Sequence, residues 1–309
     1  MTFLVAQWEG VVPEPGLFLG TPAERYHEDP CPEPSLSASV AKIALETCLN
    51  KARAAHPRLR LPDYPEEPMA EERTPPWYME VGSAVHSLAL RSGQPVVCIQ
   101  AMNWRKKDAQ DLRDQYRNEG CIPLLTKHYD IAQRMALRLQ PVLFNLMGVD
   151  FAAEAMACSQ DREFGWWTRS LLDGSAVDLR SVVELKTTQM SVAPRAVGRT
   201  INRNSNHFQS SFYLRNLDNL DPQGMGRRRY HWIHQEVEYP HEISVTHPDE
   251  ALKSAGDDLV AMAMRRWNEA MTTGEFPGYP GQSMPVGPEN WMLRDLEERM
   301  TDEEIAADA

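Results

Sequence analysis

The part of the chain from residue 151 to residue 188 constrains the fold more than any other. Three short segments, 152–158, 164–172 and 181–188, are rich in aromatic or β-branched residues, and they alternate in part between apolar and polar side chains. This pattern predicts three consecutive strands joined by turns, a β-meander. A meander that lies between helical segments indicates an α/β domain.

Helices are expected on both sides of the meander. Ser35 or Ser37 can cap a helix that ends before Pro57, because the residue before a proline disfavours helical backbone. A helix that starts after Pro123 is expected to kink at Pro141. Further helices are predicted at 81–91, 106–120, 205–217 and 249–272, and a further pair of strands at 232–237 and 242–245.

The 309 residues are expected to form a single domain with four parts. Residues 1–34 are rich in proline, glycine and acidic side chains and are expected to be an extended lead-in. Residues 35–150 form a mainly helical part, residues 151–280 the core and residues 281–309 an acidic tail. Six prolines between 57 and 76 indicate a linker or a surface loop.

Composition argues against several classes of protein. No apolar run approaches the ~18–20 residues that cross a bilayer, and no basic segment followed by an apolar one stands at the start, so we expect a cytoplasmic protein without membrane contact. The five cysteines are odd in number and widely spaced, which favours free thiols. No Cys-x-x-Cys pair is present and no cysteine follows Cys158, which argues against a zinc ribbon or an iron–sulfur cluster.

Two acidic residues and a lysine in the meander carry the most chemical information. If the last two strands form a hairpin centred near 178–179, Asp173 lies opposite Glu184, and the two-residue period of a strand places Lys186 on the face of Glu184. Two carboxylates suit Mg²⁺, whose other positions water and a substrate phosphate can fill. The lysine can orient or help to deprotonate an attacking water and offset charge on the phosphate.

Other interpretations of this segment stay open. Glu-x-Lys is a short pattern that arises by chance, and strands often carry charge pairs on a solvated face. Asp178 has the ordinary interpretation of a turn residue. A tight turn at 173–174 would instead place Asp178 on the face of Glu184 and Lys186 and make it the rival ligand to Asp173.

Three polar residues outside the meander extend the pattern. His86 lies on a predicted helix whose small residues permit close packing, and Gln209 and Tyr213 are four residues apart, on one face of the helix after the meander. Each of them alone is more often a structural residue than a ligand. Their order along the chain is more informative: His86, Asp173, Glu184-x-Lys186 and Gln209-x-x-x-Tyr213.

With this order of motifs, the chain resembles the PD-(D/E)XK nuclease superfamily in its RecB-like branch, and in particular the exodeoxyribonuclease VIII (RecE-type) exonucleases of phages and prophages. The ten residues between Asp173 and Glu184 are the specific part of the match, whereas Leu171–Leu172 stand where the family often has Arg-Pro. The resemblance implies an α/β nuclease core, a central mixed β-sheet flanked by helices, with a helical N-terminal part. Over most of the chain it includes Tyr26-His27, Pro34–Lys42, Gly82–His86, Asn103–Arg105 and Gly274–Tyr279.

The resemblance also implies roles for individual residues. Lys186 would be the catalytic lysine, and Gln209 and Tyr213 would position the scissile strand or support the site. The cofactor would be Mg²⁺, for which Mn²⁺ can substitute. Its ligands would be the carboxylates of Asp173 and Glu184, the backbone carbonyl of Leu185, the imidazole of His86 and, for a second ion, Glu154.

The function that the resemblance implies is a Mg²⁺-dependent exonuclease on linear double-stranded DNA, working from 5′ to 3′ and leaving a 3′ single strand for recombination. The partners would be double-stranded DNA ends, further copies of the chain in a ring-shaped trimer or tetramer, and a single-strand annealing protein. The setting would be the cytoplasm of a bacterium or of a phage-infected host cell. Two alternatives stay open: a non-catalytic DNA-end-binding or scaffold protein with the same fold, and an endonuclease of the same superfamily.

The distribution of charge bears on DNA binding. The net charge of −12 argues against a surface coated in basic residues. Between residues 195 and 229, however, seven arginines and two aspartates give +5, while residues 286–309 carry −6. For Arg227–Arg229, a solvated loop and a phosphate-contacting surface are equal alternatives. The residues expected to contact DNA are Arg195, Arg199, Arg203, Arg227, Arg228, Arg229, Arg105 and Lys106, the last two beside Lys107 and a possible stacking residue, Trp104.

Overall fold

A mixed β-sheet lies at the centre of the unit that ends at Pro277. The computed structural model describes residues 3–61 and 75–307, so most of the predicted linker at 57–76 lies outside the described residues. The strands lie in the order β1-β2-β6-β7-β8-β9-β10, and β3 pairs with β7. Their bounds are β1 Leu4–Gln7, β2 Gly16–Leu19, β3 Leu36–Ser37, β6 Phe151–Gln160, β7 Trp167–Ala176, β8 Ser181–Thr188, β9 Arg229–Glu236 and β10 Ile243–Thr246.

The predicted meander is present as β6, β7 and β8, three antiparallel neighbours. Gly174 pairs with Val183 and Ser175 with Val182, which is the register of a hairpin centred near 178–179. Along its other edge β8 pairs in parallel with β9 over its full length. Strands that are buried on both faces are mostly apolar, and residues 182–185 of β8 are all buried, with Glu184 the one charged residue among them.

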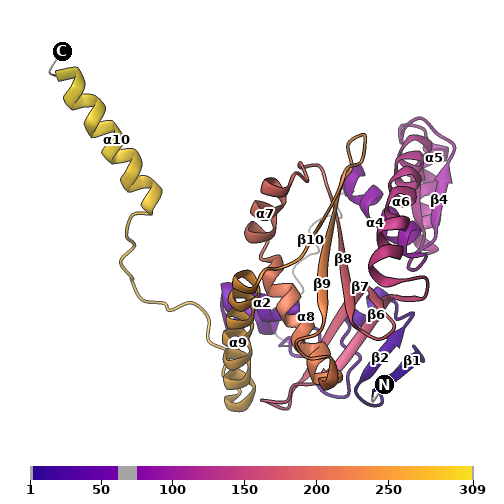
Figure 1. Ribbon diagram of the computed structural model, residues 1–309, viewed down its shortest axis with the longest axis horizontal. Helices are drawn as coiled ribbons and strands as arrows, with labels where there is room; N and C mark the ends of the chain where they lie inside the picture. The colour runs from indigo at the N-terminus through magenta and orange to yellow at the C-terminus, as the bar shows by residue number, and fades with distance from the viewer. Residues whose placement is uncertain (1–2, 62–74, 308–309) are drawn as a thin grey trace. The chain divides into compact units, whose positions relative to one another are not determined.

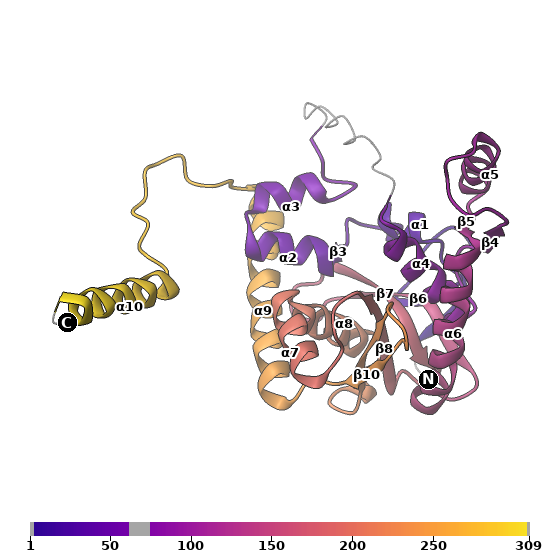
Figure 2. The same ribbon diagram turned by 90° about the horizontal axis from the view of Figure 1, so that it is seen from above.

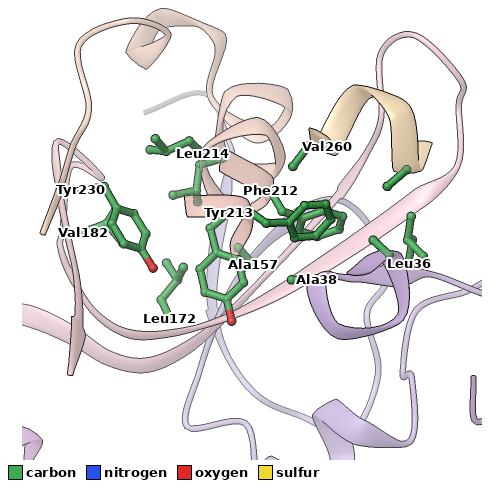
Figure 3. Close-up of a cluster of buried hydrophobic side chains, with 14 of the residues drawn as sticks. Leu36, Ala38, Ala157, Leu172, Val182, Phe212, Tyr213, Leu214, Tyr230 and Val260 are labelled. Carbon is green, nitrogen blue, oxygen red and sulfur yellow. The ribbon is translucent and has the colours of Figure 1, made fainter. Parts of the chain in front are cut away.

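Helices cover both faces of the sheet (Figures 1 and 2). One face packs against α8 (Asn206–Leu220) and α9 (Glu250–Thr273), and the other against α4 (Trp77–Leu90) and α6 (Thr126–Met147). Figure 3 shows the α8 side of this core, where Phe212 and Leu214 lie among Val182, Leu172 and Val260. The expected α/β architecture, a central mixed sheet flanked by helices, is confirmed.

Smaller elements complete the helical part. The helix predicted from Ser35 or Ser37 begins after Ser37, whose hydroxyl accepts the Val40 N–H at 3.4 Å. A small parallel sheet packs with α5 against α4 and α6, and Pro141 lies inside α6, which continues to Met147. These elements are α1 Ala23–His27, α2 Ala38–Glu46, α3 Leu49–Ala55, β4 Val96–Ile99, α5 Lys107–Asn118, β5 Ile122–Leu125 and α7 Pro194–Arg203.

One edge of β7 is divided between two strands. The other edge is paired with β6 from end to end, apart from one break at Glu154 and Asp173. On the divided edge, β3 pairs with Thr168 and Arg169, and β8 pairs with Gly174 and Ser175. Residues 170–173 therefore face a gap between β3 and β8, where backbone groups lack the regular partners of a sheet.

The first 34 residues, expected as an extended lead-in, are built into the fold. The strands β1 and β2 extend the sheet beside β6, and a buried ion pair fixes the segment that follows. Asp29 is buried 3.3 Å from the Arg169 guanidinium, and Ser35 donates to its carboxylate from both N–H and hydroxyl, at 2.9 and 2.5 Å. Four-residue strands flanked by proline and glycine give too little alternation to predict them.

The residues from Gly278 form a second unit, in which α10 (Asn290–Ala307) runs through the acidic tail. The apolar side chains of Trp291, Leu296 and Met300 on this helix are exposed. Nowhere in 3–61 and 75–307 is a helix both long and apolar enough to cross a membrane. The five cysteines are free thiols, as expected.

The Asp29–Arg169 pair gives a stability prediction. We expect Asp29→Asn to lower the free energy of unfolding by about 3 kcal/mol, because it leaves a guanidinium buried without its counter-charge. Urea denaturation measures the change. The matched control is Glu28→Gln, next in the chain, which breaks an exposed pair with Arg25 and should cost less than about 1 kcal/mol. Equal losses in the two variants would contradict a structural role for the buried pair.

Candidate active site

Three carboxylates from neighbouring strands lie in a row beside the gap in the sheet. Glu154 on β6 stands opposite Asp173 on β7, since Ala153 pairs with Gly174 and the ladder resumes on the other side of this position. The pairing of β7 with β8, extended by one residue beyond Gly174 and Val183, places Asp173 opposite Glu184. The charges of Glu184 and Glu154 both act on Asp173, so the three carboxylates repel one another and a nearby cation would relieve the repulsion.

The carboxylate of Asp173 accepts a backbone hydrogen bond of β8 in the gap, where a neighbouring strand would normally accept it. Its Oδ2 atom accepts the N–H of Leu185 at 2.7 Å. In a strand, the N–H and the C=O of one residue point to the same edge, so the Leu185 carbonyl is also directed into the gap. The gap therefore presents a backbone oxygen beside two carboxylates.

Glu184 is held by side chains from three directions. Lys186 donates from Nζ to its Oε1 atom at 2.5 Å, and Gln209 donates to the same oxygen at 2.9 Å. The hydroxyl of Tyr230 on β9 donates to Oε2 at 3.3 Å. Gln209 also donates to the Tyr213 hydroxyl at 3.2 Å, one turn along α8. The rings of both tyrosines belong to the apolar cluster of Figure 3, which fixes their hydroxyls at the site.

His86 reaches the site from α4, on the opposite face of the sheet. Its Nδ1 atom lies 4.0 Å from Oδ2 of Asp173. The approach of α4 depends on Gly82, one turn earlier, because a Cβ there would lie 2.5 Å from Oγ1 of Thr187 on β8. A larger residue at 82 would push α4, and His86 with it, away from the strands.

Glu154 is positioned by a strained backbone and a turn. Its φ angle is +45°, a conformation that side-chain-bearing residues rarely adopt. Ser92 donates to its carboxylate at 3.2 Å, and the close approach requires Gly93, whose Cβ would lie 2.8 Å from Oε2 of Glu154. The turn that ends α4 therefore holds the third carboxylate.

Burial and the charges of the site shift the pKa values of three of its residues. Burial, followed by the charge of Glu184, raises the pKa of Asp173 well above its usual range. Burial by itself would lower the pKa of Lys186, but the carboxylates of Glu184 and Asp173 raise it, so the lysine is an ammonium at neutral pH. Burial and the charge of Lys186 lower the pKa of His86, which favours the neutral imidazole that a metal requires.

These donors suit a hard divalent cation. Mg²⁺ prefers oxygen ligands, and the crowded carboxylates of Asp173 and Glu184 would be relieved by its charge. Within the described part of the chain, no three His, Cys, Asp or Glu side chains are grouped so that they could enclose a metal by themselves. An ion here would therefore also need the Leu185 carbonyl and oxygens from water or a phosphate, and Glu184 would have to share the oxygen that Lys186 now occupies.

An open cleft of about 1260 Å³ leads to these residues. Its lining includes His86, Glu154, Leu185 and Lys186 at the site, together with the first turns of α4 and residues 187–190 at and after the end of β8. Asp173 and Glu184 contact two of these lining residues, Asp173 through the Leu185 N–H and Glu184 through the Lys186 ammonium. The cleft is large enough for a chain of nucleotides to reach the carboxylates.

Asp178, the rival ligand considered from the sequence, lies in the exposed turn between β7 and β8. Its Oδ1 atom accepts the N–H of Arg180 at 3.0 Å, a typical bond of a turn aspartate. Asp173 is the residue that the structure brings beside Glu184.

The arginines selected from the sequence divide into free and paired groups. Arg195, Arg199 and Arg203 are exposed and four residues apart, so they lie on one face of α7, opposite its buried residues. Arg228, expected to contact DNA, is instead buried and paired with Asp218 and, at 2.7 Å, with Asp221. The expectation that Arg228 contacts DNA is therefore wrong, because Asp218 and Asp221, the two aspartates of the basic segment, both pair with it.

The other four residues that were expected to contact DNA are exposed. Arg227 and Arg229 flank the buried Arg228 at the start of β9, and Arg105 and Lys106 lie in the loop before α5. The ring of Trp104 is already covered by Arg113, whose guanidinium carbon lies 5.6 Å from the ring centre.

Tyr230 is the site residue that sequence reasoning missed. The strand predicted at 232–237 begins three residues earlier, at Arg229, so Tyr230 fell outside it. The signal was available in the alternation of Tyr230, Trp232 and His234, which all face the side of Glu184.

Comparisons with known proteins place the fold. No protein-family model and no curated protein matches the chain. A solved structure from Eubacterium rectale, described as a "Putative exonuclease", is similar with a TM-score of 0.52 and 13% identity, over 87% of this chain and 94% of that one. An alkaline exonuclease from Laribacter hongkongensis overlaps 64% of this chain and 96% of its own at 11% identity, with a TM-score of 0.25, which is too low to indicate a shared fold. The chain thus shares the α/β fold of the first protein.

The contact between α4 and β8 can be tested by a pair of substitutions. We expect Gly82→Ala to lower the free energy of unfolding by about 1–3 kcal/mol, since the new methyl group overlaps Thr187 Oγ1. In Gly82→Ala/Thr187→Ala the overlap is gone, and most of the loss should be recovered. Urea denaturation of both single variants and the double variant gives the coupling. Additive losses would show that α4 does not approach β8 through Gly82.

Proposed function

We propose that this protein is a Mg²⁺-dependent nuclease that hydrolyses phosphodiester bonds of DNA. The observation that carries the proposal is the meeting of Asp173, Glu184, the Leu185 carbonyl and Lys186 at a gap in the sheet, where Leu185 and Lys186 line an open cleft. The fold shared with a protein described as an exonuclease supports the same chemistry.

The residues of the site have separate tasks in this reaction. Asp173, Glu184, Leu185 and His86 would bind Mg²⁺, which when bound activates a water and stabilises charge on the phosphate. Glu154 would serve a second ion. The neutral His86 and the carboxylates are in the protonation states that binding requires once a cation offsets the repulsion that raises the pKa of Asp173.

Lys186 acts through its charge. Because its pKa is raised, it is protonated at neutral pH, so it orients the water and offsets the charge that develops on the phosphate rather than removing a proton. Gln209, which donates to Glu184, and Tyr213, which accepts from Gln209, keep the carboxylate in place or position the scissile strand.

The substrate we propose is linear double-stranded DNA, degraded from 5′ to 3′ to leave a 3′ single strand for recombination in a bacterial or phage-infected cytoplasm. The arginine face of α7, formed by Arg195, Arg199 and Arg203, follows β8 in the chain and is free to contact phosphates. A ring of three or four copies and a single-strand annealing partner belong to the same proposal.

A nucleotide-release assay tests the reaction. Linear duplex DNA labelled at one 5′ end is incubated with the protein and Mg²⁺, and with EDTA in place of Mg²⁺. We expect release with Mg²⁺ alone and a loss of at least about 100-fold in both Lys186→Ala and Asp173→Asn. The first variant lacks the ammonium that offsets charge on the phosphate, and the second lacks a carboxylate that binds Mg²⁺. Asp178→Asn is the matched control and should keep full activity.

The outcomes separate the alternatives. Release that persists in EDTA, or full activity in Lys186→Ala, would contradict the mechanism. Tight binding to duplex ends without release would favour a non-catalytic end-binding protein, and nicking of closed circular DNA would favour an endonuclease.

The arginine face predicts a change in salt dependence. In Arg195→Gln/Arg199→Gln/Arg203→Gln, the slope of the logarithm of DNA affinity against the logarithm of salt concentration should fall by up to about 3, since each lost phosphate contact removes about 0.9. Fluorescence anisotropy with labelled duplex measures it. Arg265→Gln, an exposed arginine on α9, is the control, and an equal change there would remove the special role of α7.

A further inference from the structure

The strand β9 supports the catalytic side of β8 residue by residue. The two strands are parallel and in register, with Glu184 beside Trp232 and Lys186 beside His234. Side chains that are paired in this way lie on the same face, about 5 Å apart at Cβ. Tyr230 on this face already donates to Glu184.

His234 is a buried polar side chain that is not used by any hydrogen bond of the described site. It is 2% exposed, and neither ring nitrogen has a hydrogen bond in the part of the chain that the structure describes. A buried polar group left without a hydrogen bond destabilises the fold, so such a group calls for an explanation. An apolar residue of similar size would fill the same space without that cost.

Lys186 needs a second acceptor when a metal binds. Its ammonium now lies 2.5 Å from Oε1 of Glu184, the oxygen to which Gln209 also donates. A divalent cation on Glu184 would draw on the same carboxylate and repel the ammonium. Burial, and then the charge of Lys186, lower the pKa of His234 to about 4, so its ring is neutral and offers one lone pair.

We propose that His234 is a positioning residue for Lys186: when Glu184 binds a divalent cation, a ring nitrogen of His234 accepts a hydrogen bond from the Lys186 ammonium and keeps it at the site. This inference rests on the proposed nuclease function. The imidazole touches no substrate; it acts on the reaction through the place of the ammonium. The cation thus moves Lys186 from one buried acceptor to another on the neighbouring strand.

A measurement without DNA tests the contact itself. The protein is labelled with ¹⁵N-histidine, and the His234 signals are assigned by their loss in His234→Gln. On titration with Mg²⁺ we expect one His234 ring nitrogen to move to the shift of a hydrogen-bonded acceptor. In Lys186→Met the same titration should leave that nitrogen unchanged.

Kinetics test the consequence. His234→Leu should lower turnover on linear duplex DNA roughly 10- to 100-fold, as loss of a group that supports a metal site commonly does, with KM unchanged. His234→Gln carries a carbonyl acceptor and should recover most of that loss, which a mere packing role would not explain. His241→Leu is the matched control, because His241 is also buried and its ring nitrogens have no hydrogen bond within the described residues, but it lies in the turn after β9. The turnover of this variant should equal that of the unmodified protein.

The outcomes keep the two proposals apart. A Mg²⁺-dependent shift of His234 in a protein that releases no nucleotides would support the contact and contradict the nuclease function. Release of nucleotides with an unmoved His234 signal at saturating Mg²⁺ would overturn the role of His234 and leave the nuclease function intact. Equal turnover of the Leu and Gln variants would overturn it as well.

Discussion

The hydrogen bond from the Leu185 N–H to the Asp173 carboxylate is the interaction on which the site depends. In a regular sheet, each backbone N–H at the edge of a strand donates to a backbone carbonyl of the neighbouring strand. Here β3 and β8 leave residues 170–173 of β7 without such backbone pairing. A side-chain carboxylate satisfies the exposed donor, so the strands can separate without leaving a buried N–H unpaired. The separation in turn lets His86 approach from one face of the sheet and Gln209 from the other.

Much of the centre could be predicted from sequence because the rules that apply there are local. The alternation of residues 151–188 gave three strands, and the arithmetic of one hairpin put Asp173 opposite Glu184. The structure has that register. The short strands β1 and β2 and the small sheet of β4 and β5 could not be predicted in this way, because four residues are too few for a period to appear. Contacts such as Gly82 with Thr187 join distant segments and leave no local pattern.

Charge was the hardest property to predict from sequence. The segment with a charge of +5 includes Arg215, which pairs with Asp161 at 2.7 Å, and Arg228, which is buried between two aspartates. Formal charge counts these residues as though they faced solvent. The largest group of exposed arginines in this segment lies on α7. Val197 and Ile201 are buried there, so the three arginines on the opposite side of the helix face solvent.

The helix α4 carries His86 in its middle, and the turn at its end holds Glu154 through Ser92 and Gly93. A helix transmits displacement along its axis as a rigid rod, so these two donors cannot be adjusted independently. Any substitution that moves α4 changes the spacing of both donors to Asp173 at once. Natural variation in this helix is therefore expected to be concerted, with changes at its start compensated at the turn that ends it, while the strands beneath keep their residues.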